Sequence, residues 1–396
     1  MEIEPEAHFD DTQIAFSYKT NRQLKKANFV FTIVNHPSIS AVATGLVKVG
    51  LALRLPIDGI IRNTVFSHFC GGETIEASEY TIDMLGKYNV GTILDYAVEG
   101  EKSEAGFDAT CEEILSTFEE AKKSAHVPFC VFKLTGMADG ELLTKIQAKE
   151  ILSEADQRAF GKVKDRVNRI CQKAFEFQSP VLIDAEETWL QDPIDGLARE
   201  MMHRYNQKTA IVYTTYQMYR TDSLANLKAL HGDAVAKRYY LGVKIVRGAY
   251  MEKERERSAK MTYPDPIQPN KEATDKAFND ALEFCTANVD RVSLVCGSHN
   301  EYSNLYLSEL LKKHNLPHND KRVWFSQLLG MSDNISFNLA NAGYNVVKYV
   351  PFGPVRSVMP YLFRRASENT SVAGQSSREL LMIRKELKRR KGMQRH

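Results

Sequence analysis

Polar side chains recur at the ends of short apolar segments in this sequence, and their types suit a small anionic ligand. Lys133 lies within VPFCVFKL (127–134), and Asp184 follows the apolar residues of PVLIDAEE (180–187). An unpaired charge in an apolar segment is costly, so a lysine and an aspartate on neighbouring segments would neutralise each other. The structural alternatives are a lysine at a strand edge that reaches water and an aspartate that caps the following helix.

Two pairs of cations are also placed where they could bind an anionic group. Arg364 and Arg365 are adjacent, and two guanidinium groups near one site suit a small carboxylate, although neighbouring surface arginines are common. Lys244 and Arg247 lie in the otherwise apolar segment GVKIVRGAY (242–250). They need an anion or an electron-rich partner, such as a phosphate or a reduced flavin ring, and a structural ion pair is the alternative.

Metal and nucleotide motifs are not apparent in the sequence. His314 and His318 are separated by Pro317, which favours a loop over a helix face, and Cys296 and His299 have no second pair at matching spacing. The sequence contains neither a P-loop nor a GxSxG motif. We therefore expect no metal ion.

Eight short apolar segments alternate with helix-like stretches from residue 90 onward. Each is rich in Val, Ile, Phe or Tyr and lacks polar alternation, which is typical of a parallel strand buried on both faces. The segments span 90–96, 127–134, 180–187, 210–217, 242–250, 292–299, 322–329 and 344–352. Eight such units predict an α/β fold with a (β/α)₈ TIM-type barrel, whereas an open doubly wound sheet would favour a GxGxxG turn that is missing here.

A barrel of this type brings its chemistry to the carboxyl ends of the strands. Polar residues at or just after those ends are Glu99, Lys133, Asp184, Gln217, Lys244, Arg247, His299, Gln327 and Tyr349. Residues 1–89 are predicted to form a helical amino-terminal arm, and residues 90–396 the barrel with a carboxyl-terminal helix and basic tail. Residues 254–270 contain three prolines and a run of charges, which predicts a long loop after the fifth strand.

Composition limits the class of protein. The chain has 396 residues, 43% hydrophobic and 26% charged, with a net charge of +2, which is globular and argues against nucleic acid as a partner. The six cysteines form no CxxC pair and are predicted to be reduced. The acidic amino terminus predicts no targeting signal, so we expect a cytoplasmic protein, or one on the matrix side of the mitochondrial membrane if the source is eukaryotic.

One apolar segment has two interpretations. Residues 39–57 (ISAVATGLVKVGLALRLPI) carry only Lys48 and Arg54 as charges, which fits a buried helix or an interfacial helix that contacts lipid. We hypothesise that this segment, or the basic tail from Arg384, brings the protein to a membrane surface.

Several segments together resemble the proline dehydrogenase family, and they occur in order across the proposed units. They are LDYAVEGE (94–101), FKL (132–134), IDAEE (183–187), TYQMY (215–219), VKIVRGAYMEKER (243–255), SHNEYS (298–303), QLLGM (327–331) and KYVPFGP with YLFRRASENTS (348–371). The resemblance implies an FAD-binding barrel that oxidises L-proline to 1-pyrroline-5-carboxylate, by hydride transfer from proline C5 to flavin N5. It also implies ubiquinone or menaquinone as electron acceptor.

The resemblance assigns roles to residues of this chain. Lys133, Arg364 and Arg365 would hold the proline carboxylate, Asp184 would pair with Lys133, and Glu99 would pair with Arg364 as a gate. The pyrrolidine ring would pack against Leu328, Tyr349 and Tyr361. The FAD contacts would be Gln217 at the flavin edge, Lys244 near N5, and Arg247, Gly248, Ala249, Ser298, His299, Asn300 and Glu368.

Departures and rivals also follow from the sequence. Lys244 stands where bifunctional relatives carry arginine, and their aldehyde dehydrogenase domain is missing, so the product would pass to a separate pyrroline-5-carboxylate dehydrogenase. Tyr349 predicts proline over hydroxyproline, because a relative that oxidises hydroxyproline has a small residue there. The rivals are a hydroxyproline dehydrogenase, a Schiff-base aldolase that uses Lys133, and a barrel that only binds an anionic metabolite.

Overall fold

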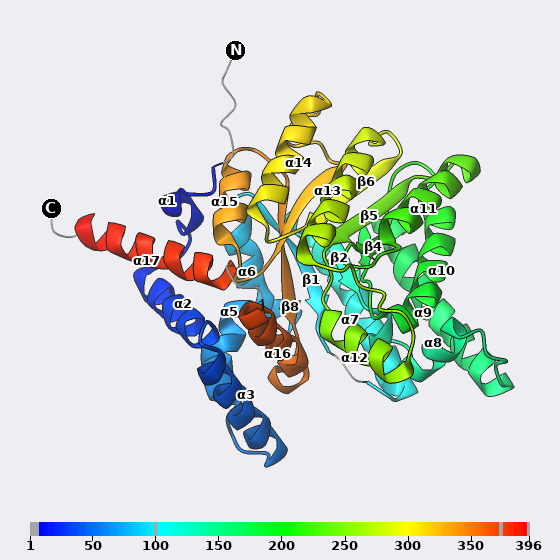
Figure 1. The fold of residues 1–396 in the computed structure, drawn as a ribbon, viewed down its shortest axis with the longest axis horizontal. Coiled ribbons are helices and arrows are strands. Elements are labelled where there is room, and N and C mark those ends of the chain that lie inside the picture. The colour runs from blue at the N-terminus through cyan, green and yellow to red at the C-terminus, as the bar shows by residue number, and fades with distance from the viewer. Residues whose placement is uncertain (1–7, 99–100, 372–374, 394–396) are drawn as a thin grey trace.

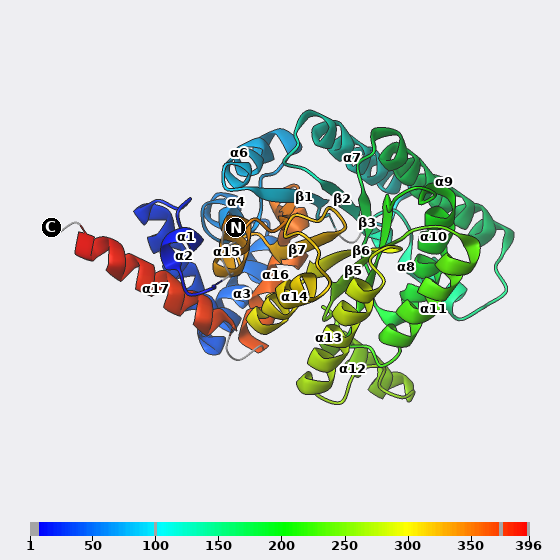
Figure 2. The same cartoon turned by 90° about the horizontal axis from the view of Figure 1, so that it is seen from above.

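The eight predicted strands form one closed parallel barrel in chain order (Figures 1 and 2). The computed structural model describes residues 8–98, 101–371 and 375–393, leaving out the side chains of residues 37, 51–52, 366–371 and 375–377. The strands are β1 Val90–Tyr96, β2 Phe129–Phe132, β3 Val181–Ile183, β4 Val212–Gln217, β5 Leu241–Val246, β6 Val292–Gly297, β7 Val323–Leu328 and β8 Val346–Phe352. Because β1 pairs with both β2 and β8, the sheet closes and the prediction of a (β/α)₈ barrel is confirmed.

Apolar side chains fill the interior of the barrel. Phe129 packs edge-to-face against Tyr213 and Trp324, with ring centroids 5.6 and 5.3 Å away. Ile93, Leu182, Val295 and Val347 are buried in the same cluster. Because these large side chains fill the part of the interior near the amino ends of the strands, polar groups can converge only nearer the carboxyl ends.

An outer layer of helices covers the barrel, and polar caps set where several of these helices begin. Ser103, Ser153 and Asn300 each accept a backbone hydrogen bond at the amino end of a helix. The helices after β1 to β8 are α7 Glu104–Lys123, α8 Gly140–Gln147, α9 Glu154–Phe177, α10 Thr188–Tyr205, α11 Ser223–Lys237, α12 Met251–Met261, α13 Lys271–Ala287, α14 Glu301–Lys313, α15 Asp333–Asn341 and α16 Val355–Ser371, with the short 3₁₀ turn η2 Leu134–Gly136.

The segment before β1 is helical, and the last helix packs beside it (Figure 1). Phe16, Leu24 and Phe31 of this arm share a small core with Met382 and Ile383 of the last helix. The helices are α1 Thr12–Ala15, α2 Asn21–Val34, α3 Pro37–Ala52, α4 Asp58–Ile61, the π-turn η1 Arg62–Phe66, α5 Ser67–Phe69, α6 Ile75–Gly86 and, at the carboxyl end, α17 Gln375–Met393. Of these elements, α6 packs directly against β1.

One local prediction was wrong. The first half of residues 254–270 belongs to helix α12, because the charge run ERERSAK is a good helix former and the prolines begin only at Pro264. The basic tail is helical up to Met393, where Arg389 and Arg390 both pair with the buried Glu386 at 2.8 and 2.7 Å. Within the described residues, the basic tail is therefore a helix that is held in part by these two ion pairs.

Helix α3 is exposed along its apolar side, so the interpretation of a buried helix was also wrong. Val42 is 63% exposed and Leu46 is 69% exposed. Ile39, Val49 and Leu53 continue this stripe at helical spacing. Within the described part of the chain, no single helix has the length and apolarity to cross a membrane, although α2 and residues 38–50, bent by 97°, meet those criteria as a pair.

Candidate active site at the barrel mouth

Five polar side chains from five strand ends meet at the carboxyl end of the barrel, and we call them the mouth cluster. Its members are Asp95, Lys133, Asp184, Lys244 and Tyr349. Lys133 Nζ lies 3.4 Å from carboxylate oxygens of both Asp95 and Asp184. Since two lysines face two aspartates, the charges balance, which is what a largely buried polar cluster requires.

Asp184 is the most connected residue of the mouth cluster. One carboxylate oxygen binds the Lys244 ammonium, and the other accepts a hydrogen bond from the Tyr349 hydroxyl at 2.8 Å. Burial alone would raise the pKa of Asp184, but Lys244 and Lys133 together lower it below 3.8. Asp184 is therefore an anion that orients both lysines.

Tyr349 completes the cluster from β8. Burial, together with the nearby charges of Asp184 and Asp95, raises the pKa of Tyr349 well above 10. The hydroxyl therefore stays protonated and can donate to Asp184. Leu328, at the end of the neighbouring strand β7, packs against the same apolar cluster as the Tyr349 ring.

Helix α16 carries the adjacent arginines directly after β8. The Arg365 guanidinium lies 5.1 Å from the centre of the Tyr361 ring, and both side chains are buried. The charge of Arg365 also reaches His299, whose pKa falls to about 3 through burial first and then through Lys348 and Arg365. Arg365 therefore lies beside Tyr361 and within electrostatic range of His299.

A second polar group lies at the ends of β4, β5 and β6. Arg247 donates to Asp275 at 2.7 Å and to Ser298 and Ser303 at 2.9 Å each, so it joins β5 to helices α13 and α14. Gln217 accepts a hydrogen bond from the Ala249 amide at 3.3 Å. Gly248 has φ +135° in this turn, a conformation that L-residues rarely adopt.

The remaining predicted site residues fall into two sets. Asn300 caps α14 by accepting from the Ser303 amide, and His299 Nδ1 lies 2.9 Å from the Ser332 hydroxyl. Glu99 and the side chain of Glu368 lie outside the part of the chain that is described, so their predicted contacts stay predictions.

A family model described as proline dehydrogenase matches residues 78–378, which include every strand of the barrel and the whole mouth cluster. The chain belongs to the proline dehydrogenase family. This agrees with the resemblance that the sequence motifs suggested.

Individual relatives support this assignment. The chain is 32% identical over 411 residues to mitochondrial proline dehydrogenase 1 of Dictyostelium discoideum, covering 91% of this chain and 72% of the relative. It is 29% identical over 412 residues to hydroxyproline dehydrogenase of Xenopus laevis, covering 95% of this chain and 88% of the relative. Its fold matches proline utilization A of Bdellovibrio bacteriovorus inactivated by N-propargylglycine, with a TM-score of 0.71, 20% identity and 91% of this chain covered, and the chain spans 38% of that protein's length.

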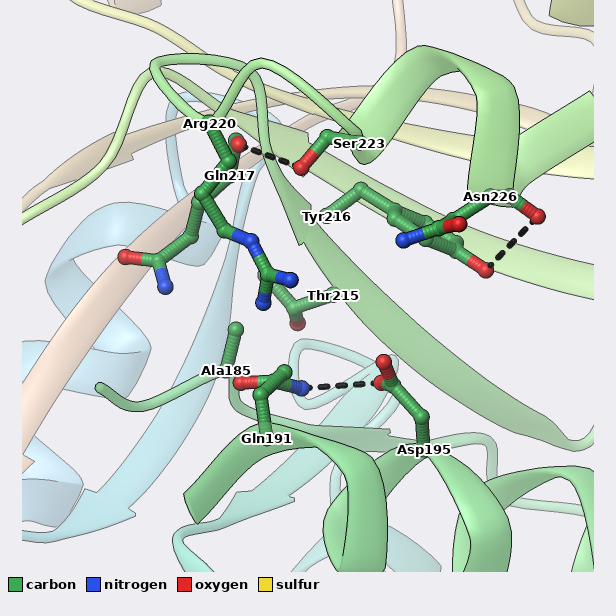
Figure 3. A pocket seen from close by; sticks show the side chains of 9 residues that line it. All are labelled: Ala185, Gln191, Asp195, Thr215, Tyr216, Gln217, Arg220, Ser223 and Asn226. Carbon is green, nitrogen blue, oxygen red and sulfur yellow. Dashed lines mark hydrogen bonds between the residues drawn. The ribbon is translucent and has the colours of Figure 1, made fainter. Parts of the chain in front are cut away.

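The structure also has a small cavity that none of the mouth-cluster residues lines (Figure 3). It lies between β4 and helices α10 and α11, where Gln191 donates to Asp195 at 2.8 Å. Its volume is about 10 Å³, which is roughly the space of one water molecule. Burial raises the pKa of Asp195 to about 6, but a cavity of this size holds neither substrate nor cofactor.

Sequence reasoning missed Asp95 and Glu186. Asp95 lies two residues after the inward-facing Ile93, so strand alternation places it at the mouth, whereas the sequence motifs point to Glu99 for this strand. Glu186 accepts from the Thr135 backbone amide at 3.0 Å and also from the Thr135 hydroxyl, and so ties the end of β3 to the segment after Lys133. Its place between Ala185 and Glu187, after the end of the apolar segment, gave no signal of that role.

Proposed function

We propose that this chain is an FAD-dependent dehydrogenase that oxidises L-proline to 1-pyrroline-5-carboxylate, the first step of proline catabolism, and passes the electrons to a quinone. The observation that carries the proposal is the mouth cluster of a proline dehydrogenase-family barrel, in which Asp184 holds Lys133 and Lys244 side by side. A cation fixed by a carboxylate at the carboxyl end of a barrel is suited to bind a small amino acid.

The carboxylate of proline would bind to Lys133 together with Arg364 and Arg365. Lys133 is 19% exposed at its side chain, so it can meet a ligand without leaving Asp95 and Asp184. Leu328, Tyr349 and Tyr361 would pack around the pyrrolidine ring and exclude water, and Glu99 would close the site through Arg364. Positioning of this kind is the main contribution that the protein makes to a hydride transfer.

The residues at the ends of β4, β5 and β6 fit FAD. The three hydrogen bonds from Arg247 to Asp275, Ser298 and Ser303 use three of the five N–H groups of its guanidinium, so it can still bind a phosphate. Gln217 would bond the flavin edge, Lys244 would lie near N5, and Gly248, Ala249, Ser298, His299, Asn300 and Glu368 would line the rest. The chemistry that FAD supplies when bound is acceptance of the hydride from proline C5.

Asp184 links the two halves of this proposed site. It contacts Lys133, the proposed substrate residue, and Lys244, the proposed flavin residue. One carboxylate would therefore fix the distance between the substrate cation and the flavin cation. This arrangement supports hydride transfer more directly than the Schiff-base alternative, because two carboxylates favour the ammonium form of Lys133 and an aldolase nucleophile must be a neutral amine.

The visible absorption spectrum of the purified protein, before and after anaerobic addition of L-proline, tests the proposal. We expect flavin bands that bleach with L-proline and far less with 4-hydroxy-L-proline, because in this proposal the Tyr349 ring would occupy the space that the hydroxyl needs. Stronger bleaching by hydroxyproline would favour the alternative that the Xenopus relative suggests. A colourless protein that stays inert after addition of FAD would overturn the proposal in favour of an aldolase or a binding protein.

The proposed acceptor, ubiquinone or menaquinone, lies in a membrane, and the exposed face of α3 supports peripheral contact with one. Residues 37–57 contain no acidic side chain, and their two charged residues are Lys48 and Arg54. This combination suits a helix that lies in the interface of an anionic bilayer. The basic residues of α17 support contact less well, because Arg389 and Arg390 are engaged with Glu386.

Co-sedimentation with vesicles that contain anionic lipid tests the membrane contact. Replacing Leu46 and Leu53 with glutamate should weaken binding by more than about tenfold, since each buried leucine contributes about 1.5–3 kcal/mol. The matched control replaces Ile151 and Val235 with glutamate. These two residues are also exposed, but they lie far from α3 in the chain. Equal binding of both variants would exclude α3 as the contact.

The location of the protein and the fate of its product complete the proposal. The relatives from Dictyostelium, Drosophila and human are described as mitochondrial, so we place this chain on the matrix side of the inner membrane if it is eukaryotic and at the cytoplasmic face otherwise. A separate pyrroline-5-carboxylate dehydrogenase would consume the product.

A further inference from the structure

The loop from β7 to α15, residues 329–332, is fixed by side chains that come from several distant parts of the chain. His68 of α5 lies with Nε2 3.0 Å from the Gly330 carbonyl, and Glu379 of α17 accepts from the Ser332 amide at 2.8 Å. His299, after β6, contacts the Ser332 hydroxyl. Ser332 has a positive φ of 51°, which is costly for a residue other than glycine, so the loop adopts a conformation that needs such support.

Lys348 makes the most direct contacts with this loop. Its ammonium donates to the Met331 carbonyl at 2.5 Å and to the Leu328 carbonyl at 3.3 Å, and it lies 2.9 Å from Asp333. Lys348 is completely buried, which for a lysine requires a full set of partners. None of these contacts involves the mouth cluster.

Adjacent residues of a strand point to opposite faces, so Lys348 faces the helix layer while Tyr349 faces the barrel interior. The carbonyl of Leu328 is held from the outside by Lys348, and the Leu328 side chain packs inside near the Tyr349 ring. The backbone of Leu329 also donates to the Tyr349 carbonyl at 2.9 Å. The backbone of Leu328 is therefore held by Lys348 as well as by the pairing of β7 with β8.

Asp333 fixes Lys348 and connects it to the amino-terminal arm. Its second carboxylate oxygen accepts from Tyr18 and from Lys19, both at 2.6 Å. Asp333 is completely buried, so the two lysines and the tyrosine neutralise and solvate a charge that water cannot reach. The arm is thus part of the support for the loop.

We propose that Lys348 is a positioning residue that sets substrate selectivity by holding Leu328 against the Tyr349 ring. This inference rests on the proposed oxidation of proline. In this inference, Lys348 touches neither substrate nor cofactor and acts only through the backbone of residues 328–331. Without it, Leu328 can move away from the ring and the pocket admits the hydroxyl of hydroxyproline.

The test compares Lys348→Met with Asn206→Ala. Asn206 is also completely buried and makes four side-chain hydrogen bonds, but at the amino-terminal ends of β4 and β5. Both variants should lower the Tm. Only Lys348→Met should lower the ratio of kcat/KM for L-proline to kcat/KM for 4-hydroxy-L-proline, by about tenfold, which is the size expected for one apolar contact in a pocket.

A second variant keeps the test decisive if Lys348→Met does not fold. His68→Phe removes the contact with the Gly330 carbonyl and keeps the aromatic packing on Phe31 and Phe69. It should lower the same ratio by a smaller factor. An unchanged ratio in either folded loop variant, or an equal fall in Asn206→Ala, overturns the inference, whereas a wild-type protein that oxidises neither substrate overturns the proposed function itself.

Discussion

The ammonium of Lys133 and the hydroxyl of Tyr349 lie 3.1 Å apart, although β1 separates the two strands that carry them. Closure of the barrel makes this contact, because β1 pairs with β2 on one side and β8 on the other. The same two residues are proposed to meet different parts of the substrate, the carboxylate and the ring. In that proposal, their contact would fix where the carboxylate of the substrate lies relative to its ring.

Replacing Lys133 with methionine should raise the KM for L-proline and lower kcat/KM by about 10- to 100-fold. The variant removes a charge-assisted hydrogen bond to the carboxylate, which contributes roughly 1.5–3 kcal/mol. Steady-state kinetics measure the change, and Lys276→Met is the control, because Lys276 forms an exposed ion pair with Asp280 on α13. A Lys133 variant that behaves like the control would remove Lys133 from the substrate site.

Two substitutions of Tyr349 should separate its hydroxyl from its ring. Tyr349→Phe loses the hydrogen bond to Asp184 but keeps the ring, so the preference for proline over hydroxyproline should persist while kcat/KM falls by about tenfold. Tyr349→Ser removes the ring and should shift the preference toward hydroxyproline. The measurement is kcat/KM for both substrates in each variant. An unchanged preference in Tyr349→Ser would mean that another residue controls selectivity.

The sequence predicts the barrel well because each strand is an apolar segment followed by a helix. It also predicts the Lys133–Asp184 pair, since β2 and β3 are consecutive and therefore adjacent. Lys348 had a signal of the same kind as Lys133, a lysine in an apolar strand, but its partners could not be found. Two of them are the backbone carbonyls of Leu328 and Met331, which carry no side-chain signal, and Asp333 is linked to Lys348 only by the fold of the loop.

The exposure of α3 shows a second limit. The composition of residues 39–57 is equally suited to a buried helix and to an interfacial one, because an apolar stripe has the same spacing in both. Only the packing of the surrounding elements reveals that Val42 and Leu46 face outward. Sequence patterns therefore give the apolar face of a helix but not what covers it.

Glu186 should make the stability of the protein depend on pH. Burial raises its pKa from 4.5 to about 7, so the folded state retains a proton that the unfolded state loses. Its contribution is fully present below about pH 4.5 and is lost as pH rises through 7, and the pKa difference corresponds to about 3 kcal/mol. Glu186→Gln should therefore gain Tm relative to the wild type at pH 8 and not at pH 4.5, as measured by thermal unfolding at both values. A difference in Tm that does not change with pH would contradict this.

Two glycines should respond in opposite ways to alanine. Gly248 has φ +135°, and a Cβ there would lie 2.4 Å from the Tyr219 ring, whereas a Cβ on Gly161 of α9 would meet no atom within 4 Å. Gly161→Ala should raise the free energy of unfolding by about 1 kcal/mol, because alanine is the better helix former. Gly248→Ala should lower it by about 1–3 kcal/mol through backbone strain and the clash with Tyr219.

Because Gly248 adjoins Arg247 and Ala249, the Gly248→Ala variant should also retain less FAD after gel filtration, measured as the ratio of flavin to protein absorbance. Full FAD retention in a destabilised Gly248→Ala protein would show that this turn supports the fold without contacting the cofactor.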